Sequence, residues 1–257
     1  MADEGKRRAL IKAFQAEGGP FSHVTIPVDE EGQRRLLRSI MNVRPAGLPD
    51  PEVLDLQDAY LREERDDRGV THLHDIASVS AHLRLWRGDI TSLACDAIVN
   101  AANSAMTGCW SPCHSCIDNA IHTFSGVQLR TECDRLMRAQ GHPEPVGRAK
   151  VTQAYNLPCS HVIHTVGPHV MGPLTREHCE QLASSYRACY EAARAGGLGS
   201  VAFCCISTGV FGFPDEEAAR IALDTVIRCQ EADESPLEVV FDVFTDRDEE
   251  LYRGLLD

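Results

Sequence analysis

Apolar positions recur with two different periods along the chain, and the change between them falls near residue 80. Before that point, charged stretches carry apolar residues at helical spacing, and clusters of glycine and proline separate the stretches. The predicted helices of this region are 3–16, 30–41 and 51–68. We expect them to form an N-terminal extension over residues 1–78, which could either brace the sheet or recognise a target, followed by a second domain over 79–257.

After residue 80, short β-rich runs alternate with longer helical stretches. Predicted strands lie near 82–87, 96–100, 150–155, 161–165, 200–206 and 238–244. Predicted helices lie near 117–140, 175–195, 215–232 and 247–256. This alternation is typical of a layered α/β fold with a mixed, largely parallel sheet. Ligands bind at the carboxyl ends of strands in such sheets, so the polar segments that follow strands are candidate ligand sites.

Composition and charge narrow the class of protein. The 257 residues, 43% hydrophobic and 25% charged, are typical of a globular protein. The net charge of -13 argues against a nucleic-acid partner, because phosphate backbones are bound by clustered lysine and arginine. No apolar run reaches the roughly 18 residues that a membrane span needs, and residues 1–6 are unlike a signal peptide. We therefore expect an intracellular, cytoplasmic protein, and the odd count of 11 cysteines favours reduced thiols.

Cys109, His114 and Cys116 lie within eight residues of one another in a segment without apolar periodicity. Thiolate and imidazole are the ligands that Zn²⁺ prefers, and three of them leave a position open for water or substrate. Cys113 as a fourth ligand would close the site and make it structural. Buried thiols without metal and a redox pair of Cys113 with Cys116 are the alternatives, and the spacing favours zinc.

Polar side chains follow the first two predicted strands of the sheet. Asp89 could accept a hydrogen bond from an exocyclic amine or cap the next turn, and capping is the commoner role for such a residue. The amides of Asn100 and Asn103 are suited to sugar hydroxyls, although asparagine also favours loops for backbone reasons. Asp118 falls in the first turn of the next predicted helix, where it is either a cap or, beside a metal, a candidate general base.

A further polar segment follows the predicted strand 200–206 and opens a helix. Its residues are Ser207, Thr208, Gly209, Val210, Phe211, Gly212 and Phe213. The two glycines permit close backbone approach to a phosphate, and a helix N-terminus favours its charge. The alternative is an ordinary turn whose aromatic residues pack into the core. Phe244, at the end of the last predicted strand, could likewise be core or stack on a base.

Taken together, these motifs resemble the macrodomain family of ADP-ribose-binding modules. The matching segments are Gly88–Thr91, Ile98–Asn103, Ala154–Pro158, Val162–Pro168 and Ser207–Pro214, in the right order over about residues 82–245. Where most hydrolytic macrodomains carry a glycine-rich loop, this chain carries the cysteine- and histidine-containing segment 108–118. That replacement and the helical extension are similar to the zinc-containing class, whose members remove mono-ADP-ribose from proteins.

The resemblance implies a three-layer α/β/α fold with a mixed central sheet, and it implies roles for the residues of one pocket. Asp89 would bind the adenine amino group with help from the backbone of Ile90, and Phe244 would stack on the base. The segment 207–213 would hold the diphosphate. Asn100 and Asn103 would face the distal ribose.

The resemblance also implies the chemistry. Cys109, His114 and Cys116 would bind Zn²⁺, and Asp118 together with Asn103 would be catalytic. The implied activity is hydrolysis that releases ADP-ribose from a mono-ADP-ribosylated protein, in a system that includes a sirtuin-like ADP-ribosyltransferase. A reader module that binds ADP-ribose without cleavage and a deacetylase acting on O-acetyl-ADP-ribose are the alternatives.

Overall fold

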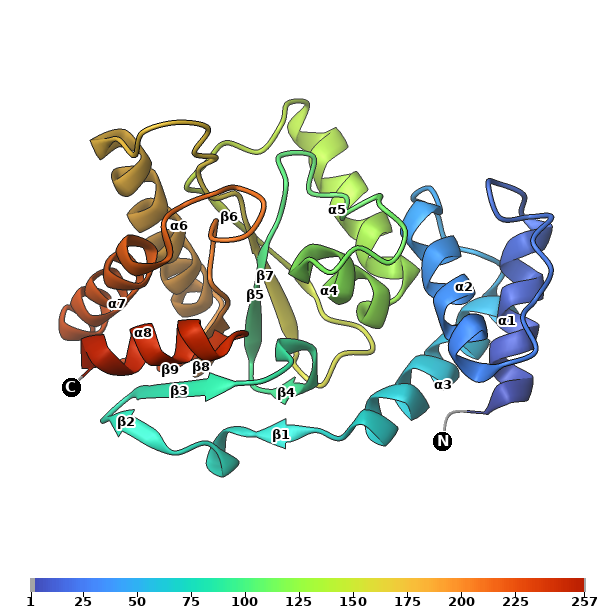
Figure 1. Ribbon diagram of the computed structural model, residues 1–257, viewed down its shortest axis with the longest axis horizontal. Coiled ribbons are helices and arrows are strands. Elements are labelled where there is room, and N and C mark those ends of the chain that lie inside the picture. Colours follow the sequence, from blue (N-terminus) through green and yellow to red (C-terminus); the bar gives the residue numbers. More distant parts are fainter. Residues whose placement is uncertain (1–2, 257) are drawn as a thin grey trace.

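The computed structural model describes residues 3–256, and a seven-stranded mixed sheet lies at its centre (Figure 1). Its strands are β2 (Ser78–Ser80), β3 (Leu83–Arg87), β5 (Ala97–Ala101), β6 (Ala149–Gln153), β7 (His161–Thr165), β8 (Ser200–Phe203) and β9 (Glu238–Val243). They are ordered β2-β3-β9-β8-β5-β7-β6. The edge strands β2 and β6 run antiparallel to their neighbours and the other pairs are parallel, which confirms the predicted sheet.

Helices cover both faces of this sheet (Figure 1). One face carries α6 (Arg176–Ala195), α7 (Asp215–Glu231) and α8 (Asp246–Leu256), and the other carries α4 (Ile117–Ser125) and α5 (Val127–Gln140). All four residues of β8 are buried, as expected for a parallel strand that is covered on both sides. The α/β/α layering predicted from the sequence is confirmed.

The N-terminal extension is a separate group of three helices that packs beside α4 and α5 rather than on the sheet (Figure 1). Its members are α1 (Glu4–Ala16), α2 (Glu30–Val43) and α3 (Pro51–Arg68). These helices share an apolar core, which consists of Leu10, Ile11, Phe14, Leu36, Leu37, Ile40, Met41, Tyr60 and Leu61, with Val127 of α5 joining it. The extension therefore has its own core and meets the rest of the protein through the α4–α5 layer.

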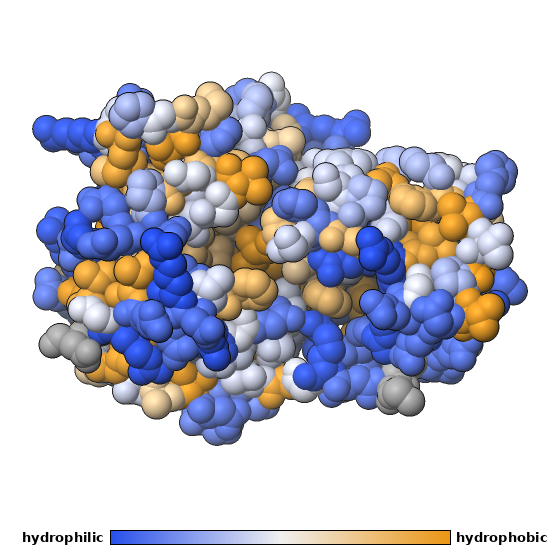
Figure 2. Space-filling view, viewed as in Figure 1, coloured by the Kyte–Doolittle hydropathy of each residue, from blue (hydrophilic) through white to orange (hydrophobic). Residues whose placement is uncertain are grey.

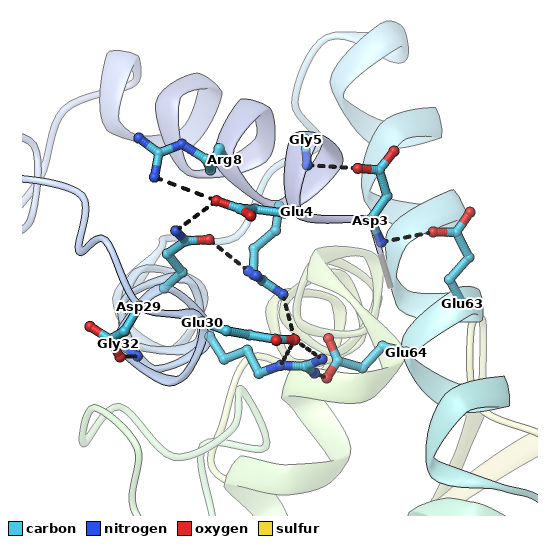
Figure 3. A network of polar contacts seen from close by, with 12 residues as sticks. Asp3, Glu4, Gly5, Arg8, Asp29, Glu30, Gly32, Glu63 and Glu64 are labelled. Atoms are coloured by element: carbon cyan, nitrogen blue, oxygen red, sulfur yellow. Dashed lines mark hydrogen bonds and ion pairs between the residues drawn. The ribbon is translucent and has the colours of Figure 1, made fainter. Parts of the chain in front are cut away.

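Polar contacts hold the three helices of the extension together (Figure 3). The side chains of Asp3 and Asp29 cap the first turns of α1 and α2 by accepting hydrogen bonds from backbone nitrogens. Glu30 on α2 accepts a 2.7 Å hydrogen bond from Arg34, which also pairs with Glu64 on α3. As a result, α2 is fixed by both apolar and charged contacts.

The single helix predicted over 117–140 is wrong, because the chain breaks between α4 and α5 at Gly126. This residue has φ 102°, a conformation that only glycine adopts without strain. A Cβ atom there would also lie 2.6 Å from Gln128 Oε1 and 2.7 Å from Gln57 Nε2. The backbone nitrogen of Val127, the first residue of α5, donates to Gln57 Oε1 at 3.0 Å, so α3 caps the start of the second helix, and the local pattern does not report this contact.

Two further differences concern short elements. The strand predicted over 200–206 ends at Phe203, so the next residues lead directly into the loop that follows. The pattern also misses β2 and the parallel pair of β1 (Thr71–His72) with β4 (Leu93–Ala94), since strands of two or three residues carry too little periodicity. Ser78 at the end of the predicted extension enters the main sheet, and residues 1–2 and 257 of the two predicted domains lie outside the described residues.

Within residues 3–256, no helix combines the length and the apolar character that a bilayer crossing requires.

Candidate active site

A cavity of about 1030 Å³ lies where β3, β5, β8 and β9 end at their carboxyl termini. Figure 2 shows the surface hollowed near the centre of this face, with hydrophobic residues deep inside. Of the predicted site residues, the wall contains Asp89, Ile90, Asn103, Cys109, His114, Cys116, Asp118, Ser207, Thr208, Gly209, Val210, Phe211 and Phe244. The parallel strands bring these residues together from segments more than a hundred positions apart in sequence.

Asp118 is the second residue of α4, and its carboxyl group is buried in the cavity wall. Asn100 Nδ2 donates to its Oδ1 at 2.8 Å, and Asn103 Nδ2 donates to its Oδ2 at 3.3 Å. Burial raises the pKa of Asp118 to about 6, against the opposing effects of Asn100 and of the Arg130 charge. A carboxyl group whose pKa lies near neutrality is suited to accept and return a proton.

Asn100 lies on β5 behind Asp118 and does not line the cavity. Its second amide hydrogen is directed at His164 Nδ1 at 3.1 Å, and His164 Nε2 lies 2.9 Å from Thr152 Oγ1. Because an amide nitrogen can only donate, Nδ1 must accept and the proton of His164 is on Nε2. Asn100 therefore orients Asp118. The sequence predicts that Asn100 faces a sugar, but its side chain lies outside the cavity.

Asn103 does line the cavity, and its side chain is held on three sides. Its Nδ2 donates to the backbone oxygen of Gly108 at 3.1 Å as well as to Asp118, and its Oδ1 accepts from the nitrogen of Ala105 at 3.0 Å. These bonds fix the turn after β5 against the start of the segment 108–116. We call this segment the metal loop, after the zinc site that the sequence predicts there.

The metal loop brings the side chains of Cys109, His114 and Cys116 together at the cavity wall. Their ligand atoms lie within 4.8 Å of one another, and His114 Nδ1 is buried without a hydrogen-bond partner. Burial raises the pKa of the Cys116 thiol, and the nearby Cys109 adds to this effect. A divalent cation among these atoms would satisfy the histidine nitrogen and stabilise both thiolates, so the donor set fits a metal.

Cys113 is not part of that group. Its backbone adopts φ 54°, and its sulfur lies 3.2 Å from Ser39 Oγ and 3.4 Å from the backbone oxygen of Arg35, both on α2. The position of Cys113 therefore favours three protein ligands with an open coordination position over the closed site of the alternative interpretation.

A second group of donors lies behind Asp118 and consists of His122, Cys133 and His164, all of them buried. Both nitrogens of His164 are already engaged by Asn100 and Thr152, and burial raises the pKa of the Cys133 thiol. His164 is hydrogen-bonded, as predicted. The two ring nitrogens of His122 are buried without a hydrogen-bond partner, and its Nε2 lies 3.5 Å from Asp118 Oδ1, so His122 packs behind the wall that carries Asp118.

Asp89 also lines the cavity, and each of its carboxylate oxygens has a different partner. Its Oδ1 accepts from the backbone nitrogen and the hydroxyl of Thr91, which is the predicted capping role, and its Oδ2 accepts from Arg68 Nη1 at 3.0 Å. The carboxylate remains half exposed at the cavity, while Ile90 is buried in the wall. Phe244 lies at the mouth with 80% of its surface exposed, so it is available for stacking and is not core.

The predicted phosphate segment divides into two parts. Residues 207–211 line the cavity, whereas Gly212 does not and Phe213 is buried in the main core. The backbone nitrogen of Phe213 donates to the oxygen of Ser207 and closes this turn. The first turn of α7 carries three carboxylates, from Asp215 onward, which offset the positive end of the helix dipole and leave the loop backbone to meet a phosphate.

Comparisons with known proteins place the chain in a family. A profile of the Macro domain family matches residues 99–222. A protein of Treponema medium named protein-ADP-ribose hydrolase is 51% identical, with all of both chains covered. The chain belongs to the macrodomain family. A Staphylococcus aureus protein of the same name is 43% identical to this macrodomain over all of its length and 97% of the relative.

Solved structures extend the comparison to the fold. The Trypanosoma brucei macrodomain in complex with ADP-ribose superposes with a TM-score of 0.66 and 30% identity. The alignment covers 85% of this chain and 95% of that one. The α/β core described above is therefore that of a macrodomain.

The macrodomain cavity also contains residues that the sequence patterns did not single out. Asp242, Thr245, Arg247 and Asp248 line it, and all of them lie at or just after the end of β9. Their one sequence signal is this position after a strand, because isolated polar residues form no motif. Arg38 and Asn119, which hydrogen-bond to the backbone of the metal loop, carry no sequence signal at all.

Proposed function

We propose that this macrodomain is a zinc-dependent hydrolase that removes mono-ADP-ribose from modified protein side chains and releases ADP-ribose. The enzyme class is that of relatives 43% and 51% identical over the whole chain, which are named protein-ADP-ribose hydrolases. Zinc dependence is inferred from one observation, the presence of a buried carboxyl group and a set of metal donors in the same cavity. Asp118, held by two asparagines, shares its wall with Cys109, His114 and Cys116.

The set of residues that line the cavity supports the placement of ADP-ribose. Asp89 and Phe244 would meet the adenine, the loop 207–211 would meet the diphosphate, and Asn103 with Asp118 would meet the distal ribose. The Trypanosoma brucei macrodomain holds ADP-ribose on the same fold. This placement puts the bond to the modified protein next to the metal loop.

Hydrolysis breaks the bond between the ribose and the protein side chain, with the hydroxyl of water going to one fragment and its proton to the other. Asp118 is placed to accept that proton and return it, and Asn100 and Asn103 keep its two oxygens in one orientation. When bound by Cys109, His114 and Cys116, zinc supplies a Lewis acid at the same end of the cavity.

Two other functions would use the same cavity. A reader would retain ADP-ribosylated partners without cleavage, and a deacetylase would act on O-acetyl-ADP-ribose. The two relatives named protein-ADP-ribose hydrolases favour an enzyme over a reader. A sirtuin-like ADP-ribosyltransferase as the source of the substrate stays a prediction.

The test is a time course of ADP-ribose release from a protein that carries mono-ADP-ribose on acidic side chains. Zinc content is measured in the same preparation, and serine-linked, arginine-linked and O-acetyl substrates are run in parallel. Several turnovers per enzyme on a modified protein, abolished by a chelator and restored by zinc, is the expected result. Retention of every substrate without cleavage would favour the reader, and cleavage of the O-acetyl compound alone would favour the deacetylase.

A further inference from the structure

The N-terminal extension contacts the metal loop directly, and Arg38 of α2 makes the contact that lies nearest a predicted metal ligand. Arg38 Nη2 donates to the backbone oxygen of His114 at 3.1 Å. We propose that Arg38 is a positioning residue for the metal loop, so that the extension forms part of the active site although none of its residues is a metal ligand. This inference rests on the proposed function and assigns a task to a region that the fold alone leaves open.

A second path runs from Arg38 to the same loop through Asn119. Arg38 Nε and Nη2 donate to Asn119 Oδ1 at 3.0 and 2.7 Å, and Asn119 Nδ2 donates in turn to the backbone oxygen of Ser111 at 2.9 Å. Asn119 is fully buried on α4, next to Asp118. One guanidinium therefore fixes the loop at two points, one of them the backbone of a predicted metal ligand.

Neighbouring residues of α2 hold the tip of the loop. Asn42 Oδ1 accepts from the backbone nitrogen of Cys113 at 2.9 Å, and its Nδ2 donates to Thr123 Oγ1 on α4 at 2.9 Å. Ser39 Oγ lies 3.2 Å from the sulfur of Cys113. Because Arg38 and Asn42 are four residues apart, they project from the same face of the helix. This face makes Cys113 an anchor of the loop to the extension.

The physical need for such an anchor follows from the loop itself. Between β5 and α4 the chain forms no helix or strand, and three ligands that converge on one ion must be ordered before they bind it tightly. The helix that supplies the anchor is rigid, since it is fixed by the core of the extension and by the ion pairs of Figure 3. Groups that orient metal ligands in this way typically change metal affinity by about 10- to 100-fold when removed.

The test compares Arg38→Gln with Arg35→Gln in the full chain. Arg35 is a matched control, because it lies on the same helix with the same charge and is exposed. Zinc affinity is measured by competition with a chromogenic chelator, and hydrogen exchange is followed for the amides of residues 108–116. We expect Arg38→Gln to bind zinc about 10- to 100-fold more weakly and to exchange loop amides faster, while Arg35→Gln follows the wild type.

Unchanged zinc affinity and unchanged loop exchange in Arg38→Gln would overturn the inference. Arg38→Lys retains the charge and one donor, so its zinc affinity and loop exchange are expected to lie between those of the wild type and of Arg38→Gln. It replaces Arg38→Gln if that variant does not fold. If the wild type binds no zinc, the zinc-dependent function fails, and the exchange of the loop amides still decides whether Arg38 orders the loop. The ADP-ribose affinity of each variant shows that the remainder of the cavity is intact.

Discussion

The side-chain nitrogen of Asn100 donates a 2.8 Å hydrogen bond to Asp118 Oδ1. The first residue belongs to β5 and the second to α4, so this buried bond joins the sheet to the helix at the wall of the cavity. The orientation of the central carboxyl group thus depends on a residue that does not itself reach the cavity.

Replacing Asn100 by alanine should lower kcat by about 10- to 100-fold, since a hydrogen bond to a charged group contributes roughly 1.5–3 kcal/mol. The Kd for ADP-ribose should change little, because Asn100 lies behind the wall. Steady-state kinetics and calorimetry measure the two quantities. Asn156→Ala is the control, because Asn156 is also buried but lies away from the cavity. It should reduce stability without lowering kcat. Wild-type kcat in Asn100→Ala would refute the positioning role.

Replacing Asp118 by asparagine keeps the size of the side chain and removes the proton acceptor. Turnover should fall by about 10²- to 10⁴-fold, the usual contribution of general acid–base catalysis, with ADP-ribose affinity nearly intact. Asp224→Asn on the exposed side of α7 is the control for loss of one negative charge. Turnover that is insensitive to the change at Asp118 would leave this residue a structural role only.

Replacing Cys116 by serine should remove both metal and activity, because two remaining ligands hold zinc far more weakly than three. Metal analysis of the purified protein is expected to fall from about one zinc per chain to nearly none. Cys179→Ser, which changes a cysteine outside the ligand group, should keep both. A metal-free Cys116 variant with full activity would show that zinc is not required for the reaction.

Arg68, the last residue of α3, is a second side chain of the extension that contacts a residue of the cavity wall. It donates to Asp89 Oδ2 at 3.0 Å while its guanidinium lies 3.7 Å from the ring centre of Phe124. Arg68→Gln should reduce the preference for ADP-ribose over the hypoxanthine analogue, which lacks the exocyclic amine, by about tenfold. Binding of both ligands is measured by calorimetry, with Arg62→Gln on the same helix as control. An unchanged ratio would separate Arg68 from base recognition.

Acid should destabilise the fold through His164, whose pKa is lowered by burial to about 3. Between that value and the unfolded pKa of about 6.5, the unfolded chain binds a proton that the native protein does not, so the free energy of unfolding falls as pH falls. The loss at pH 5 is about 2 kcal/mol. The free energy of unfolding is measured with urea at several pH values from 7 to 5. Plotted against pH, it should fall less steeply in His164→Asn than in the wild type. The same dependence of the unfolding free energy on pH in both proteins would contradict a neutral His164 in the native state.

The layered fold could be predicted because its signals are local. The predicted helices 51–68 and 175–195 agree with α3 and α6 to within one residue, since apolar periodicity and breaker residues act over a few positions. The helix predicted over 117–140 failed at Gly126, where φ is 102° and the next residue, Val127, donates its backbone nitrogen to Gln57 of α3. No pattern within that segment reports a residue about seventy positions away.

The sequence by itself determined the strand and helix order, the segments that would meet at the cavity, and the donor set of Cys109, His114 and Cys116. Only the tertiary structure decided that Asn100 orients Asp118, that Cys113 faces α2, and that Arg38 holds the metal loop. These outcomes depend on side-chain directions and on contacts between distant segments, which are set when separate elements pack together. Residue type and spacing fix which chemistry is available, and packing fixes which atoms face one another.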